Sequence, residues 1–162
     1  MRNTQFIRTL IALTVLVVAT SAFATDQTRD AVIFAGRQEL MLERPFNDFL
    51  GRLPAFPRFD ITSTANYKGY TARWEVKDSR LYLTSFIATT NGQPVALTLF
   101  FPNRNLPILS DWYSGTIHIT SGRDSFAQGY HTYERVFTLS VTNGVVTATN
   151  EMRNVREDKL KR

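Results

Sequence analysis

The sequence predicts an all-β fold, mainly antiparallel, in which a curled sheet forms a barrel or a two-layer sandwich beside one short helix. Short stretches in which apolar and polar residues alternate recur along the chain, which is typical of strands with one buried face. Asn-Gly pairs at residues 91–92 and 143–144 indicate tight hairpin turns. No repeated strand–helix–strand pattern is present, which argues against a parallel sheet.

The first elements predicted are a hairpin and the helix. The stretch AVIFAGRQELML, residues 31–42, contains two apolar segments separated by Gly-Arg, which indicates two strands and a turn. In PFNDFL, residues 45–50, the apolar residues fall at helical spacing, and Pro45 suits the first turn of a helix. Gly51 stands where this helix would stop, and the prolines that follow predict an irregular connection.

The rest of the chain predicts strands. They are expected at residues 69–76, 81–87, 95–101, 112–120, 134–142 and 145–149. In GYTARWEV, residues 69–76, alternation places Trp74 on an apolar face, which predicts a core position; a sugar-stacking platform is the alternative. The continuous apolar run at 95–101 predicts a strand buried on both faces, and Ser121-Gly122 predicts a turn.

Residues 1–24 have the three parts of a secretory signal peptide. Arg2 and Arg8 form a basic start, and Leu10–Ala19 is an apolar run too short to cross a bilayer as a stable helix. The small-x-small sequence that ends at Ala24 predicts cleavage after this residue. We therefore expect a periplasmic or secreted protein with no membrane insertion once the signal peptide is removed.

Composition predicts a single β-rich domain at residues 25–150 and a charged C-terminal tail at 151–162, either a frayed helix or disordered. The chain has no cysteine, which excludes disulfides and thiolate chemistry. Without Arg2 and Arg8 the formal charge falls from +5 to +3, with 17 basic and 14 acidic residues. This mild and dispersed charge gives no reason to expect nucleic acid as a partner.

Four stretches resemble parts of a known family when taken together. They are AVIFAGRQELML with PFNDFL, then TANYKGYTARWEVKDSRLYLTSF, then DWYSGTIHITSG, then GYHTYERVFTLSVTNGVV. In this order they resemble a family of small uncharacterised bacterial β-rich proteins that carries G-Y-x-A-x-W-E, L-Y-L, D-W-Y-S-G and Y-E-R motifs. The resemblance covers most of residues 31–147. It implies one β-rich domain and no known activity, ligand or catalytic residue.

Two stretches are the expected ligand contacts: DWYSG at 111–115 and GYHTYER at 129–135. They combine aromatic rings with charged side chains, the residue types that interfaces favour. The residues predicted to bind are Asp111, Trp112, Ser114, Tyr130, Tyr133, Glu134 and Arg135. For Trp112, strand alternation predicts an outward position beside polar residues, and the alternative of a tryptophan covered by a loop stays open.

The function expected is a non-catalytic binding domain for a protein, a glycan or a small molecule. An alternative is a carbohydrate- or envelope-active hydrolase that uses two of Glu75, Asp111 and Glu134. A third is an inhibitor or immunity-type protein for an envelope hydrolase. Ser114 lacks the glycine before it that a nucleophile elbow needs. Two histidines without cysteines predict no metal site, and no phosphate loop or other cofactor motif is present, so no cofactor is expected.

Overall fold

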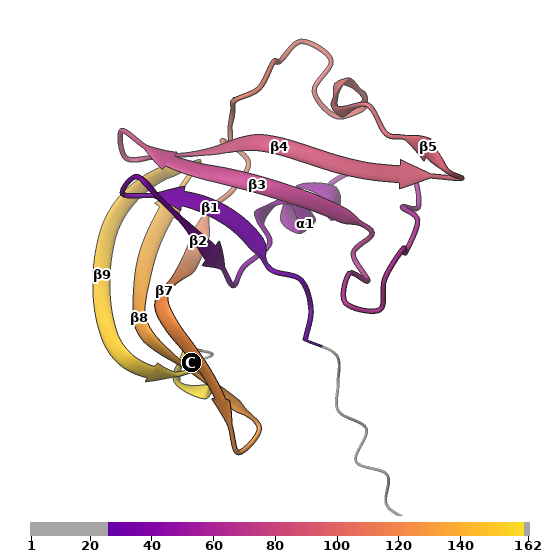
Figure 1. The fold of residues 1–162 in the computed structure, drawn as a ribbon. Coiled ribbons are helices and arrows are strands. Elements are labelled where there is room, and N and C mark those ends of the chain that lie inside the picture. Colours follow the sequence, from indigo (N-terminus) through magenta and orange to yellow (C-terminus); the bar gives the residue numbers. More distant parts are fainter. Residues whose placement is uncertain (1–25, 161–162) are drawn as a thin grey trace, which may run out of the picture.

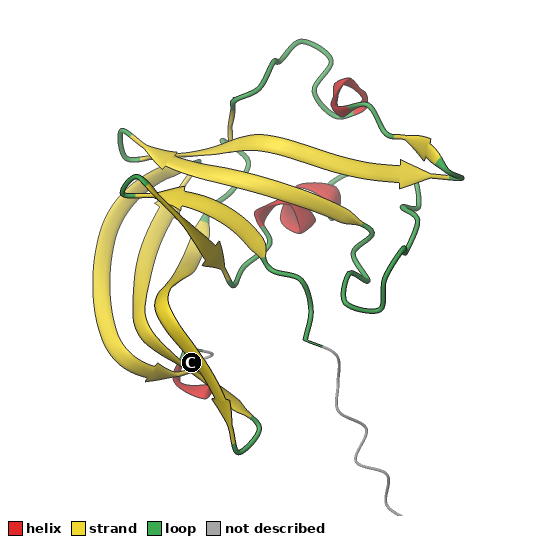
Figure 2. Cartoon of the chain, viewed as in Figure 1, coloured by secondary structure: helices red, strands yellow, loops and turns green. Residues whose placement is uncertain are grey.

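The computed structural model describes residues 26–160, and its main element is one nine-stranded sheet, shown in Figures 1 and 2. The strands are β1 Asp30–Phe34, β2 Arg37–Met41, β3 Tyr70–Lys77, β4 Arg80–Thr90, β5 Gln93–Pro94, β6 Ile108–Leu109, β7 Gly115–Ala127, β8 Tyr130–Thr142 and β9 Val145–Arg156. The helical elements are α1 Pro45–Leu50 and two short 3₁₀ turns, η1 Leu97–Leu99 and η2 Glu157–Lys159. The predicted all-β class with one short helix is confirmed. The predicted signal peptide lies outside the described residues.

The sheet curls until it closes on itself. Its strands follow the order β3-β1-β2-β7-β8-β9-β4-β5, and β3 also pairs with β4, which completes the ring. Neighbouring strands are antiparallel apart from the pair β1 and β3. The seam between β4 and β9 is short: the Leu81 N–H donates to the Gly144 carbonyl and the Val146 N–H donates to the Ser79 carbonyl, each over 2.8 Å.

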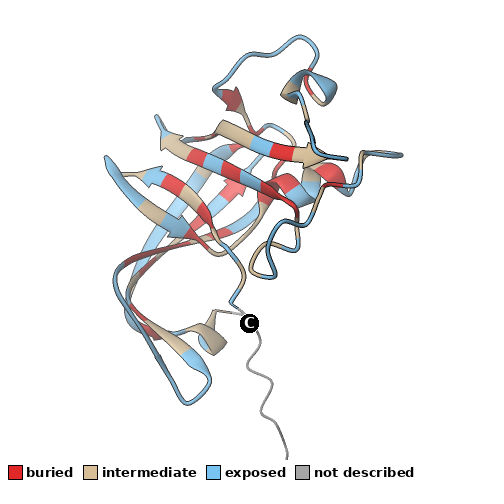
Figure 3. Ribbon diagram, turned by 45° about the vertical axis from the view of Figure 1, so that its right-hand side comes forward, coloured by how far each residue is buried: buried red, intermediate tan, exposed pale blue. Residues whose placement is uncertain are grey.

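The main core fills the inside of the curled sheet, because alternate residues of its strands point inward. Along β3 the buried and exposed residues alternate, with Tyr70, Ala72 and Trp74 buried, as Figure 3 shows. Helix α1 lies beside β3 and β4 (Figure 1), and the ring of its Phe46 lies 4.6 Å from that of Phe86. The prediction that Trp74 is a core residue is confirmed. No helix among residues 26–160 is long and apolar enough to cross a membrane.

The predicted strand at 95–101 is wrong. The two-residue strand β5 ends at Pro94, directly before this stretch, and the chain then turns through η1. The amide groups of Leu99 and Phe100 donate to the carbonyls of Ala96 and Leu97, so local hydrogen bonds replace a strand ladder. The expected burial on both faces also fails, since Leu99 is 58% exposed, although Phe101 is buried.

Three predictions near the C-terminus also differ from the structure. The turn expected at Ser121-Gly122 is a bulge: β7 continues to Ala127, and its pairing with β8 shifts between Ser121 and Asp124. The strand expected from Trp112 begins only at Gly115. Residues 151–156, expected to be a frayed helix or disordered, complete β9, because β8 is long enough to pair with them.

Candidate functional site

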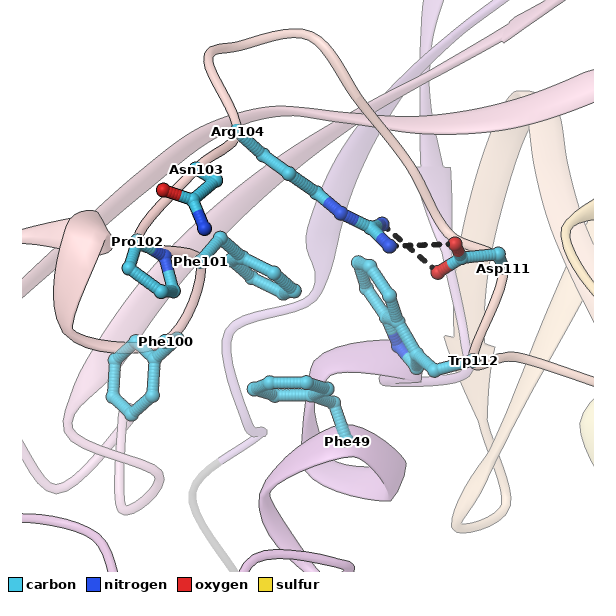
Figure 4. Close-up of a pocket in the computed structure, with 8 residues that line it drawn as sticks. All are labelled: Phe49, Phe100, Phe101, Pro102, Asn103, Arg104, Asp111 and Trp112. Atoms are coloured by element: carbon cyan, nitrogen blue, oxygen red, sulfur yellow. Dashed lines mark hydrogen bonds and ion pairs between the residues drawn. The ribbon is translucent and has the colours of Figure 1, made fainter.

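An aromatic pocket of about 320 Å³ opens beside α1 (Figure 4). Three segments supply its walls: helix α1, the loop after η1, and the loop that leads into β7. Its lining residues are Phe49, Phe100, Phe101, Pro102, Asn103, Arg104, Asp111 and Trp112. We call this site the aromatic pocket. Two of the residues predicted to bind a ligand, Asp111 and Trp112, belong to it.

Three rings in mutual contact form the wall of the aromatic pocket. The Phe101 ring stacks on Phe49, with centroids 4.7 Å apart, and on Trp112, with centroids 5.1 Å apart. The Phe49 and Trp112 rings lie 5.2 Å apart in a tilted arrangement. Phe101 is buried and the other two are half-buried, so this wall packs against the core on one side and is accessible on the other.

Trp112 is fixed to the helix. Its indole Nε1–H donates a 3.1 Å hydrogen bond to the carbonyl oxygen of Pro45, the first residue of α1. Trp112 therefore lies in a loop that packs on α1, and the expectation of an outward residue on a strand is wrong at this position. The alternative, a tryptophan covered by a loop, fits in part, because Phe101 of the loop after η1 stacks on the Trp112 ring, which stays half-buried.

An ion pair forms the rim of the aromatic pocket. Arg104 donates two hydrogen bonds to Asp111, from Nη1 to Oδ1 over 3.0 Å and from Nη2 to Oδ2 over 2.8 Å. The hydrogen bonds to Asp111 raise the pKa of Arg104 above its usual value. Because both side chains are nearly half exposed, at 46% and 45%, the pair remains in contact with solvent. It ties the two loops together and leaves the lining without net charge.

The second predicted stretch, GYHTYER, lies far from the aromatic pocket. Gly115 pairs with Val141 at one end of the β7–β8 ladder, and Ala127 pairs with Tyr130 at the other. The 13 residues of β7 correspond to about 40 Å of strand at ~3.3 Å per residue. The two predicted stretches therefore do not form one site.

Side chains in the second stretch hold the sheet together. Tyr133, predicted to bind a ligand, is buried in the sheet, and burial raises its pKa. The Glu134 carboxylate accepts a 3.0 Å hydrogen bond from the Arg123 N–H at the β7 bulge. Arg135 donates to the Ser121 hydroxyl over 3.0 Å. Only Tyr130 in this set has an exposed ring, and the Arg156 guanidinium lies 4.9 Å above it.

Ser114 also has a structural contact. Its hydroxyl accepts a 2.9 Å hydrogen bond from the Asn143 N–H and donates one of 3.2 Å to the Asn143 side-chain oxygen. These bonds fasten the β8–β9 turn to the loop before β7. Ser114 does not line the aromatic pocket.

A smaller pocket of about 150 Å³ lies between β2 and β7, and Tyr133 lines it. The Ser121 hydroxyl donates a 2.7 Å hydrogen bond to Glu39 and accepts the one from Arg135. These polar groups bind one another, so they stabilise the junction of the two strands.

The acidic residues and histidines do not gather around the aromatic pocket. Of the three predicted carboxylates, only Asp111 lines it; Glu75 and Glu134 do not. His118 contacts Glu43 over 2.6 Å, away from this lining. Within residues 26–160, no cluster of histidine and acidic side chains is suited to hold a metal ion.

Most of the aromatic pocket was missed by the sequence predictions. The missing residues are Phe49, Phe100, Phe101, Pro102, Asn103 and Arg104. One signal was present: FFPNR places two rings beside a proline and two polar side chains, a combination that suits a ligand-contacting loop. Helical spacing included Phe49 in the predicted helix but gave no sign of a pocket; in the structure its ring packs partly buried against the core and also lines the pocket.

No family model, no curated protein and no solved structure matches the chain. The resemblance described from the sequence motifs thus stays an expectation, and the geometry of the described residues is what supports a function.

Proposed function

We propose that this protein is a periplasmic or secreted, non-catalytic binding domain whose ligand enters the aromatic pocket. Export is supported by the signal-peptide pattern of residues 1–24, which ends at Ala24. A cysteine-free domain with an extensive apolar core is compatible with an oxidising compartment, because nothing in it can oxidise to a disulfide.

The observation that carries this proposal is the combination of an aromatic wall and a polar rim in one concave site. Ligand pockets are mostly apolar, with a few polar groups that orient the ligand, and they measure about 300–1,000 Å³. The aromatic pocket, at about 320 Å³, is at the small end of this range. Its rings already contact one another and its rim is bridged by an ion pair, so little ordering is needed when a ligand binds.

The chemistry of the lining favours binding over catalysis. The lining contains no serine, threonine, histidine, lysine or tyrosine, and Asp111 is its one carboxylate. Hydrolysis of a glycosidic bond ordinarily requires a pair of carboxyl groups. Both oxygens of Asp111 already accept hydrogen bonds from Arg104.

The test of binding is a fragment screen on the purified protein. Neutral sugars, aromatic compounds and charged metabolites are screened by saturation-transfer NMR, and each hit is repeated with Trp112→Ala. The matched control is Phe126→Ala, because Phe126 is a 62% exposed ring at the far end of β7. We expect hits that Trp112→Ala removes and Phe126→Ala retains. Hits that all survive Trp112→Ala, or no hits, contradict the proposal.

Export is tested separately by mass spectrometry of the same protein. The proposal expects a mature chain that begins at Thr25 in the periplasmic fraction. An intact Met1 in the cytoplasmic fraction contradicts it.

A further inference from the structure

We infer that the aromatic pocket binds a neutral sugar ring of a glycan. This inference rests on the proposed function and names its ligand class. It follows from four properties of the pocket: the aromatic wall, the donors and acceptors of the rim, the absence of net charge, and the open side.

The wall suits the apolar face of a sugar. One face of a pyranose ring presents C–H groups, and such a face packs on an aromatic ring whose π surface is slightly negative. Phe49 and Trp112 are both half-buried, so each retains accessible surface after packing on Phe101. Figure 4 shows these side chains around the pocket, with the ion pair at its edge.

The rim suits hydroxyl groups, which both donate and accept hydrogen bonds. A carboxylate offers about four lone-pair sites and a guanidinium five N–H donors. The Arg104–Asp111 pair uses two of each, so about two acceptor sites and three donors stay unused by this pair. Asn103, which is exposed beside Arg104, adds an amide that can donate and accept. An entirely apolar ligand would make no use of these rim groups.

The balanced charge of the pocket lining favours a neutral ligand. Arg104 and Asp111 are the charged residues of the lining, and they neutralise each other. An anion would have to compete with Asp111 for Arg104, and a cation would have to compete with Arg104 for Asp111. The Arg104 guanidinium, already paired with Asp111, would also repel a cation that approached the rings from this edge.

The volume of the aromatic pocket and its open side suit one sugar ring of a longer glycan. The volume of about 320 Å³ is at the small end of the range of ligand pockets, about 300–1,000 Å³, which suits a single ring rather than a whole oligosaccharide. Four lining residues are exposed: Pro102, Asn103, Arg104 and Asp111. The open side lets the rest of a glycan leave the pocket into solvent.

The experiment is isothermal titration of the full mature protein with four kinds of probe. The first is a set of neutral oligosaccharides of glucose, mannose, galactose or N-acetylglucosamine. The second is an acidic oligogalacturonate, the third a cationic chitosan oligomer, and the fourth the neutral apolar compound N-phenyl-1-naphthylamine. We expect at least one neutral oligosaccharide to bind and the acidic and cationic sugars not to bind.

Variants of the rim and of Trp112 locate the binding. The double variant Arg104→Ala with Asp111→Ala removes the exposed rim, and we expect about a tenfold loss of affinity, the effect of one or two hydrogen bonds to charged groups. Its matched control is Arg156→Ala with Asp158→Ala, which removes another exposed bidentate Arg–Asp pair, on β9 and η2. This control should bind as the unchanged protein does. Trp112→Phe, which keeps a ring, should lose less affinity than Trp112→Ala.

The outcomes separate this inference from the proposed function. Binding of N-phenyl-1-naphthylamine that depends on Trp112, with no neutral oligosaccharide bound, overturns the glycan inference and leaves a binding pocket. A charged sugar bound in preference to the neutral ones also overturns it, as does oligosaccharide binding that the rim variant leaves unchanged. If no probe binds in a Trp112-dependent way, both the inference and the proposed function fail.

Discussion

The indole Nε1–H of Trp74 donates a 2.9 Å hydrogen bond to Oδ2 of Asp30, and both side chains are completely buried. Lys68, whose side chain is 6% exposed, forms an ion pair with the same carboxylate. The Lys68 ammonium also lies 4.7 Å from the centre of the Tyr70 ring. One buried carboxylate thus joins the start of β1 to β3, the parallel strand pair that helps the sheet to close.

Replacing Asp30 by asparagine should be strongly destabilising. The variant Asp30→Asn leaves Lys68 buried without its counter-charge, and removing one partner of a buried ion pair costs about 3–5 kcal/mol. Urea unfolding followed by circular dichroism measures the free energy of unfolding. Asp111→Asn, at a pair that is nearly half exposed, should cost less than about 1 kcal/mol. Equal losses of stability in Asp30→Asn and Asp111→Asn would show that the buried ion pair does not stabilise the fold. Adding Lys68→Met to Asp30→Asn should restore part of the lost stability, because it removes the unpaired charge.

The two Asn-Gly turns provide a test of how the sheet closes. Gly92 and Gly144 have nearly equal positive φ angles, 74° and 76°. A Cβ on Gly92 would meet nothing within 4 Å, whereas on Gly144 it would lie 2.8 Å from the Ser110 carbonyl oxygen. We expect Gly92→Ala to cost about 1 kcal/mol for the left-handed backbone. Gly144→Ala should cost a further ~1–3 kcal/mol for the steric clash.

Thermal and urea unfolding of both glycine variants measure this difference. Since Gly144 also accepts the seam bond from Leu81, hydrogen exchange at the Leu81 amide should accelerate in Gly144→Ala alone. Equal stability of the two variants would show that the contact with Ser110 is not tight in solution.

Asp60 should make part of the stability depend on pH. The backbone N–H of Gly92, the side chain of Thr89 and the backbone N–H of Asn91 lower its pKa below the usual 3.8, with the Gly92 bond as the largest cause. A carboxyl group whose pKa is lower in the folded state adds stability above its unfolded pKa, and this contribution is lost as the pH falls through the folded value. At pH 7 the urea concentration at the unfolding midpoint should therefore be higher for the unchanged protein than for Asp60→Asn. This difference in midpoint should disappear below pH 3.8. A gap that is equal at both pH values excludes this role.

Sequence patterns predicted the fold where local signals and final packing agree. Helix α1 begins at Pro45 and ends at Leu50, as proline position and apolar spacing indicate. Strand β3 follows the alternation around Trp74. Each of the two Asn-Gly turns joins the strands of one hairpin, β4–β5 and β8–β9. The strand predicted at 95–101 is absent because apolar content alone does not make a strand. After Val95, no neighbouring strand forms a hydrogen-bond ladder with these residues. The bulge at Ser121 looked like a turn because both features use a glycine with positive φ.

The aromatic pocket could be predicted only in part. Asp111 and Trp112 were predicted to bind a ligand because an acidic residue stands next to an aromatic one in the sequence. Their partners come from a helix and from a loop whose path the sequence pattern does not define. Arg104 reaches Asp111 across seven positions of chain in which the two-residue strand β6 is the one regular element, and neither periodicity nor turn chemistry fixes that geometry. Local patterns therefore located one wall of the pocket and not the residues opposite.

The most direct measurement is a titration of isotope-labelled protein with the neutral oligosaccharide set, followed by the two tryptophan indole N–H signals. Trp112→Phe assigns them by removing one. We expect the Trp112 signal to shift as the ligand binds and the signal of the buried Trp74 to stay in place. Signals that both stay in place, or shifts confined to the amides of residues 130–135, would contradict a ligand site in the aromatic pocket.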